Sequence, residues 1–151
     1  MEFSAEEQEL ILRAERIIAD RLPGQVFVNG TESVFTFLRL HFAPSEREIF
    51  GVIFLNAQSR IIAFETLFMG SVNTVEVHPR IVAQQALKHN ACSVILVHNH
   101  PSGNPVPSKA DEIITARMTD ALNTLDIRVL DHMIVCGYII TSFAERGMIL
   151  H

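Results

Sequence analysis

Two spacings of apolar residues divide this 151-residue chain into helices and strands. Apolar positions three and four residues apart are typical of a helix with one buried face, whereas short continuous or alternating apolar runs are typical of strands. The first spacing predicts helices over residues 5–22, 32–41, 79–88 and 109–123. The short runs predict strands over residues 49–55, 60–68, 92–98, 128–135 and 138–142.

The order of these elements favours a layered α/β (α+β) fold. Two helices come first, a β-hairpin follows, and helices and strands then alternate. Such a chain buries its apolar faces in a three-layer α-β-α sandwich with a central mixed sheet. We expect residues 1–43 to form an N-terminal helical segment and residues 44–151 to form the main domain. The N-terminal helices either pack on that domain or serve as the arm of a homodimer.

Composition narrows the class of protein. Apolar residues make up 48% of the chain and charged residues 19%, which is typical of a globular domain. The sequence has no apolar run of about eighteen residues, so we predict no membrane-spanning helix. The acidic N-terminus is unlike a signal peptide, and Cys92 and Cys136 lie in apolar runs, as buried thiols do. A cytoplasmic, reducing location is therefore expected.

The charge of the chain disfavours a nucleic-acid partner. The formal net charge is −5, and the arginines are dispersed along the sequence. Affinity for a phosphate backbone comes largely from clustered cationic side chains. We therefore expect any binding of DNA to be weak and sensitive to salt.

Residues 98–111 carry the densest group of chemically active side chains. His98 and His100 end an apolar run, and residues two apart on a strand point to the same side. Ser108 precedes a predicted helix, and Asp111 lies in its first turn. Each part alone has a simpler interpretation, since Ser-x-x-Asp is a helix cap and the residues between form a turn. Together, two imidazoles and a carboxylate predict a metal site with one open position, as in catalytic zinc sites.

The string from His98 to Asp111 resembles the JAMM signature of the JAB/MPN+ metalloproteins. The segments 76–80, 86–91 and 131–135 resemble the RadC-like branch of that family. The resemblance implies a cytidine-deaminase-like JAB/MPN fold and one zinc ion per chain, bound by His98, His100 and Asp111. Iron, manganese or cobalt suit the same ligands. Residues 1–43 show no helix-hairpin-helix pattern, so the chain resembles a short form of the branch.

The resemblance also implies a glutamate beside the first central strand, where it binds the water that attacks the substrate. Glu48 directly precedes the strand predicted over residues 49–55 and is the best match. Glu46 is a weaker candidate, and Glu65 on the next strand is the alternative if the register differs. In this scheme the carboxylate moves a proton, and Ser108 donates a hydrogen bond to the developing oxyanion.

Three functions remain as alternatives. The first is a zinc metallohydrolase that cleaves an amide bond, peptide or isopeptide, in a protein or peptide substrate. The second is an accessory protein of DNA repair or of mobile elements, which the acidic charge disfavours. The third is a non-catalytic metal-binding scaffold, which the complete motif disfavours. We expect His78 and His132 to support the ligands or the fold.

Overall fold

Five strands lie side by side in the computed structural model, which describes residues 2–27, 32–71 and 75–149. They are β1 (Ile49–Leu55), β2 (Ile61–Met69), β3 (Ser93–Asn99), β4 (Arg128–Cys136) and β5 (Ile139–Ser142). Their order in the sheet is β2-β1-β3-β4-β5. Strands β3 and β4 are parallel, and the other neighbouring pairs are antiparallel. The sheet is therefore mixed, as predicted.

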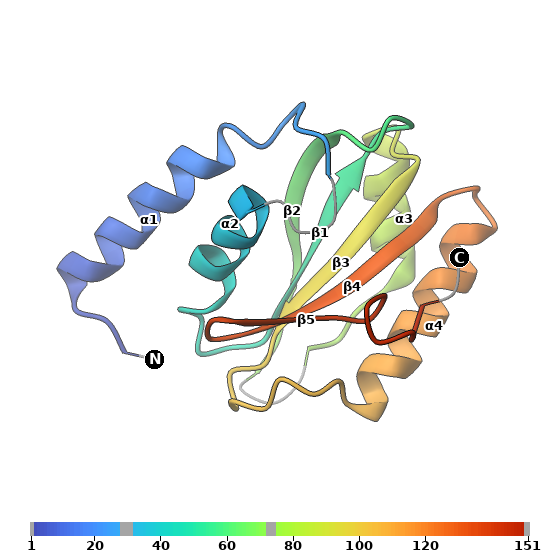
Figure 1. Cartoon of the computed structure of the whole chain (residues 1–151). Helices are drawn as coiled ribbons and strands as arrows, with labels where there is room; N and C mark the ends of the chain where they lie inside the picture. The colour runs from blue at the N-terminus through green and yellow to red at the C-terminus, as the bar shows by residue number, and fades with distance from the viewer. Residues whose placement is uncertain (1, 28–31, 72–74, 150–151) are drawn as a thin grey trace.

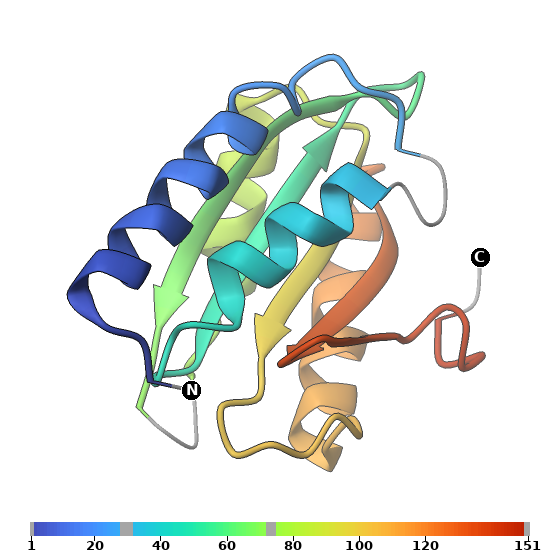
Figure 2. The same ribbon diagram turned by 60° about the vertical axis from the view of Figure 1, so that its left-hand side comes forward.

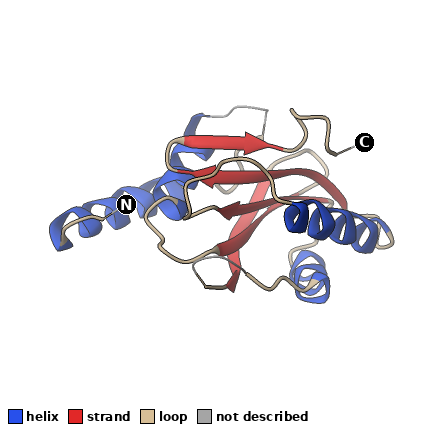
Figure 3. Cartoon of the chain, turned by 90° about the horizontal axis from the view of Figure 1, so that it is seen from below, coloured by secondary structure: helices blue, strands red, loops and turns tan. Residues whose placement is uncertain are grey.

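Helices cover both faces of this sheet (Figure 1). They are α1 (Ala5–Ala19), α2 (Glu32–Phe42), α3 (Pro79–Lys88) and α4 (Lys109–Asn123). Figure 2 shows α2 on one face with α1 beside it, while α3 and α4 lie behind the strands. The view from below shows the strands as a layer with helices on either side (Figure 3). The predicted three-layer sandwich is confirmed, and none of these four helices is long and apolar enough to span a bilayer.

Alternation along the central strands decides which residues reach each layer. In β1, Phe50, Val52 and Phe54 join the core beneath α3 and α4, whereas the residues between them face α2. Strand β3 alternates in the same way, with Leu96 on the α4 side and Val97 on the α2 side. Because side chains alternate with period two, the strand end places His98 on the α4 side and Asn99 on the α2 side.

The N-terminal helix differs from its prediction. It ends at Ala19 rather than near Leu22. Pro23 disfavours a helical backbone at the residue before it, which accounts for the earlier end. The predicted apolar stripe is buried only in part. Leu10 and Ile17 are 61% and 59% exposed, whereas Leu22 is 5% exposed and Ile18 packs against the core. Helix α1 packs beside α2 rather than directly on the sheet, so only part of its apolar stripe is covered.

The prediction of two buried thiols is wrong for Cys92, which is exposed, and Cys136 is half-buried. Strand β3 begins only at Ser93, so Cys92 lies in the turn that follows α3. A loop was also predicted over residues 70–74, and residues 72–74 lie outside the described part of the chain.

Candidate metal centre

The predicted site residues meet at one edge of the sheet, where β3 ends and β1 begins. The antiparallel pairing of these strands sets Phe50 opposite His98, so Glu48 comes from the same edge. The loop after β3, at the bottom of Figure 1, leads to the first turn of α4. Because β3 and β4 are parallel, this edge is also where their carboxyl ends meet, a common position for ligand sites.

Three side chains offer ligand atoms to one point at this edge. Nε2 of His98 lies 2.9 Å from Nε2 of His100 and 3.2 Å from Oδ1 of Asp111. Nε2 of His100 lies 3.0 Å from Oδ2 of Asp111. Ligand atoms about 2.0–2.1 Å from a tetrahedral zinc ion are roughly 3.3 Å apart. The three residues are therefore spaced as a group that can hold a metal ion.

A capping box fixes Asp111 in this position. The hydroxyl of Ser108 accepts a hydrogen bond from the backbone N–H of Asp111 at 3.0 Å. In return, Oδ2 of Asp111 accepts from the backbone N–H of Ser108 at 2.8 Å. The helix-cap interpretation of the Ser-x-x-Asp pattern is confirmed, and the cap leaves Asp111 beside His98 and His100.

The loop after β3 sets the hydrogen position on His100. Its Nδ1 lies 2.7 Å from the carbonyl oxygen of Asn104, which can only accept, so Nδ1 carries the hydrogen. In the neutral ring Nε2 then keeps a lone pair directed at His98 and Asp111. Lone pairs 2.9 Å apart repel one another unless a proton or a cation lies between them. This donor set fits a metal ion.

The charges of the three side chains also favour a cation between them. Burial acts to raise the pKa of Asp111, but the neighbouring imidazoles of His100 and His98 hold it well below its usual range. The bond to Asp111 raises the pKa of His100, whereas burial lowers that of His98. The ionised carboxylate therefore favours positive charge at the point where the three side chains meet.

Glu48 and Ser108 line a hollow of about 390 Å³ together with His98 and Asp111. Burial raises the pKa of Glu48, with the charge of Asp111 adding to the rise and that of His100 opposing it. A carboxylate with a raised pKa is a better proton acceptor near neutral pH than an exposed one. The structure thus places Glu48 in the same hollow as two of the three candidate ligands.

The two alternative glutamates lie elsewhere. Glu46 is exposed and lines a separate hollow beside His100. Phe68 of β2 and His98 of β3 both lie opposite Phe50, so they mark the level of the site in the sheet. Glu65 lies three residues before Phe68 on β2. That offset is roughly 10 Å along a strand. Its carboxylate instead contacts Nε2 of His89 at 3.2 Å. Geometry favours Glu48 over both.

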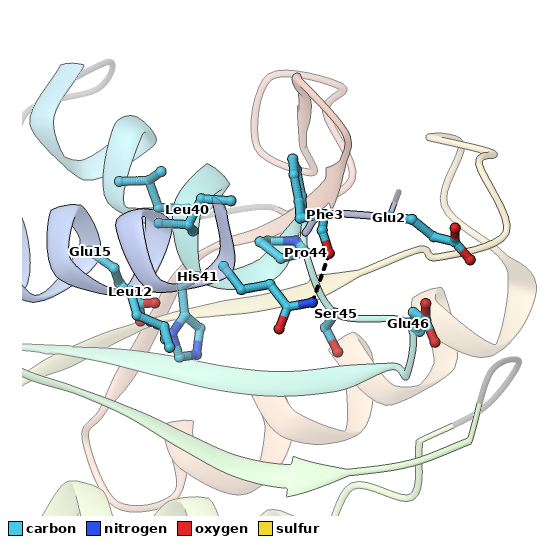
Figure 4. A pocket seen from close by; sticks show the side chains of 11 residues that line it. Glu2, Phe3, Leu12, Glu15, Leu40, His41, Pro44, Ser45 and Glu46 are labelled. Carbon is cyan, nitrogen blue, oxygen red and sulfur yellow. Dashed lines mark hydrogen bonds and ion pairs between the residues drawn. The ribbon is translucent and has the colours of Figure 1, made fainter. Parts of the chain in front are cut away.

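A larger hollow, of about 590 Å³, lies between α1 and α2 (Figure 4). It is lined by apolar side chains such as Leu12 and Leu40, and Glu15 in its wall contacts His41. His98, His100 and Asp111 do not line it. We assign the chemistry to the smaller hollow because His98 and Asp111 line it together with Glu48, whose pKa is raised.

The model of the RadC-like JAB domain family matches residues 28–148 of this chain. The chain belongs to the RadC-like JAB domain family. It is 49% identical to UPF0758 protein YkfG of Escherichia coli (strain K12) over 98% of this chain and 94% of that protein. It is 50% identical to UPF0758 protein YeeS of the same strain, over 95% and 97% of the two chains. A UPF0758 protein of Paracidovorax citrulli is 44% identical over 90% of this chain, which spans 57% of that longer relative.

Asn99 is a residue of this RadC-like JAB domain whose role the sequence did not indicate. It lies between the two histidine ligands but faces the α2 side, where it is 2% exposed. Its Oδ1 accepts from the backbone N–H of Ile49 at 2.8 Å. Its Nδ2 donates to the carbonyl of Arg47 at 3.0 Å and lies 3.4 Å from those of Phe42 and Ser45. Asn99 thus clamps both neighbours of Glu48 to the end of β3.

Replacing Asn99 with leucine is expected to lower the free energy of unfolding by about 2–3 kcal/mol, because buried backbone groups lose their partner. The matched control is Asn56→Ala. Oδ1 of Asn56 likewise accepts two backbone N–H groups, those of Gln58 and Arg60, but at an exposed turn. We expect the control to cost less than about 1 kcal/mol, since water can replace its bonds. Urea denaturation of both variants measures the difference, and equal losses would contradict the clamp.

The two supporting histidines have different surroundings. His132 is fully buried and contacts Nδ1 of His98 at 2.8 Å. His78 stands at the N-cap position of α3 without a side-chain capping bond, is largely exposed, and contacts Glu76 and the ring of Phe68. Only His132 of this pair touches a ligand. Its partner Thr115 was overlooked in the sequence, although its position four residues after Asp111 places it on the same face of α4.

Proposed function

We propose that this RadC-like JAB domain is a zinc-dependent hydrolase that cleaves an amide bond in a peptide or protein. The observation that carries the proposal is the shared hollow. His98, Asp111, Glu48 and Ser108 all line the same space. A purely structural metal site has four protein ligands and needs no proton acceptor beside it.

The ligand set leaves one position for chemistry. His98, His100 and Asp111 would hold the ion through Nε2, Nε2 and a carboxylate oxygen. When bound, zinc would supply Lewis acidity, which lowers the pKa of water toward about 7 and polarises a carbonyl group. Two imidazoles and one carboxylate are a ligand type found in catalytic zinc sites, which supports zinc over metals that prefer oxygen ligands alone.

Glu48 and Ser108 divide the remaining work. Glu48 accepts a proton from the attacking water and returns it to the leaving amine, a task that suits its raised pKa. Ser108 accepts a hydrogen bond from Asp111 N–H through its oxygen, so its own hydroxyl hydrogen stays available. That hydrogen can be donated to the oxyanion that develops on the substrate; losing such a donor typically raises the barrier by about 3 kcal/mol.

The walls of the hollow support a substrate with an apolar side chain next to the scissile bond. Val75, Val77 and Ile114 line it together with His98 and Asp111, and Arg117 lines it too. An extended chain passing this point would set one peptide group beside Glu48 and Ser108.

A cleavage screen tests the proposal. The purified protein is incubated with a peptide library and with isopeptide-linked peptides, and products are identified by mass spectrometry. We expect cleavage that stops with a chelator and returns when zinc is added back. A protein that binds zinc stoichiometrically but cleaves no amide in either library would contradict the proposal and favour a non-catalytic scaffold.

A further inference from the structure

A chain of hydrogen bonds runs from the first turn of α4 to the buried side of His98. The hydroxyl oxygen of Thr115 lies 2.7 Å from the carbonyl oxygen of Asp111 and 2.5 Å from Nδ1 of His132. The other ring nitrogen of His132, Nε2, lies 2.8 Å from Nδ1 of His98. His132 thus connects α4 to a ligand from behind the metal centre.

Donor and acceptor rules assign the hydrogens along this chain. A carbonyl oxygen only accepts, so the hydroxyl of Thr115 gives its one hydrogen to Asp111. Its oxygen then accepts from Nδ1–H of His132. A neutral imidazole has a single N–H, so Nε2 of His132 accepts from Nδ1–H of His98. The lone pair of His98 is left on Nε2, the atom that faces His100 and Asp111.

The surroundings of His132 hold its ring neutral and in one orientation. The residue is 0% exposed. Its ring stacks on that of Phe143 at 4.6 Å, and the ring of Phe50 meets it at 67° with centroids 5.6 Å apart. A charge among these apolar rings would be costly, and the rings leave the imidazole no space to turn.

We propose that Thr115 and His132 are positioning residues that fix the tautomer of His98, so that Nε2 is kept free of hydrogen for a metal ion. The inference rests on metal binding by His98, His100 and Asp111, the first part of the proposed function, and adds two residues that do not touch the metal. Without the hydroxyl, Nδ1–H of His132 loses its acceptor. The hydrogen of His132 then moves to Nε2, that of His98 moves to its own Nε2, and it competes with the metal there.

Valine at position 115 removes the hydroxyl and keeps the shape of the side chain. Thr115→Val is expected to weaken zinc binding by about 10- to 100-fold, as is typical of residues behind metal ligands. Thr115→Ser, which restores the hydroxyl, should bind zinc nearly as tightly as the original chain. Thr119→Val is the matched control, because the Thr119 hydroxyl makes the same kind of bond, 2.8 Å to the carbonyl of Thr115, one turn further along. Competition with a chromophoric chelator at fixed pH measures all four affinities.

A second measurement needs no metal. In protein labelled with ¹⁵N-histidine, long-range ¹H–¹⁵N spectra report which ring nitrogen of His98 carries hydrogen. We expect Nδ1–H in the original chain and in Thr115→Ser, and Nε2–H in Thr115→Val. If Thr115→Val fails to fold, His132→Gln and His132→Leu replace it, because the glutamine carbonyl can still accept from His98 and should bind zinc more tightly than leucine.

The outcomes separate this inference from the proposed function. Zinc affinity unchanged in Thr115→Val, or reduced equally in Thr119→Val, would overturn the role of the hydroxyl while leaving the metal site in place. An original chain that binds no zinc would overturn the proposed function and the metal part of this inference, and the spectra would still decide whether Thr115 and His132 fix the tautomer of His98.

Discussion

Glu48→Gln is expected to keep zinc bound and to slow amide hydrolysis by about 10²- to 10⁴-fold, the range that a general base contributes. Glutamine matches the shape of glutamate but cannot accept a proton from water. Glu48 is not one of the ligand residues, so the metal content should stay the same. Elemental analysis and the rate on the best peptide from the cleavage screen measure the two effects separately.

The controls for this variant are the other two glutamates. Glu46→Gln and Glu65→Gln should retain most of the activity, since one side chain is exposed and the other contacts His89. The pH profile offers a second check. Burial raises the pKa of Glu48. As the pH is lowered, activity should therefore be lost at a higher pH than it would be with an exposed glutamate as the base. A Glu65→Gln variant that loses activity while Glu48→Gln retains it would show that the base lies on β2.

Asp111→Asn is expected to weaken zinc binding by more than about 100-fold, which is the upper end of the effect of residues that support metal ligands. The amide oxygen of asparagine can still accept from Ser108 N–H, so the start of α4 should persist. The negative charge that favours a cation beside His98 and His100 is removed. Excess zinc at about 100 times Kd stabilises a folded binder by about 2.7 kcal/mol, or roughly 5–10 °C in Tm for a domain of this size. The variant should show no such shift.

Glu112→Gln is the matched control for Asp111→Asn. It removes a carboxylate from the same turn of α4, but Glu112 contacts Lys109 at 3.4 Å on the surface rather than the ligands. It should bind one zinc ion per chain and keep the thermal shift. Equal zinc content in Asp111→Asn, Glu112→Gln and the original chain would show that the ion, if bound, lies elsewhere.

The secondary structure followed closely from the sequence. The strand at 49–55 and the helices at 79–88 and 109–123 have the predicted bounds, because continuous apolar runs and the Pro79 and Ser108 starts are local signals. The N-terminal helix was less predictable. Its apolar spacing is genuine, but which neighbour covers a helix depends on tertiary packing rather than on its own periodicity.

The cluster of His98, His100 and Asp111 could be anticipated because these residues lie close together in the sequence and on elements of known direction. The residues behind them could not. In the sequence, Thr115 is only a polar residue within an apolar helix face. Its partner His132 lies seventeen residues later, on a strand. Asn99 reads as part of a turn, since only the pairing of β1 with β3 shows that it clamps the segment before Ile49. Contacts between distant segments carry this information, and a single sequence does not display them.

The positions of the site residues in the sequence bear on the order in which the site assembles during folding. All three ligands lie within residues 98–111, on one strand and the helix that follows it. Closing so short a loop costs little chain entropy, so this unit can capture an ion before the sheet is complete. Glu48 directly precedes β1 and reaches the site only when β1 pairs with β3. Under the proposed function, a nascent or partly unfolded chain would therefore bind the metal before it has its general base, and amide cleavage would begin only when folding is finished.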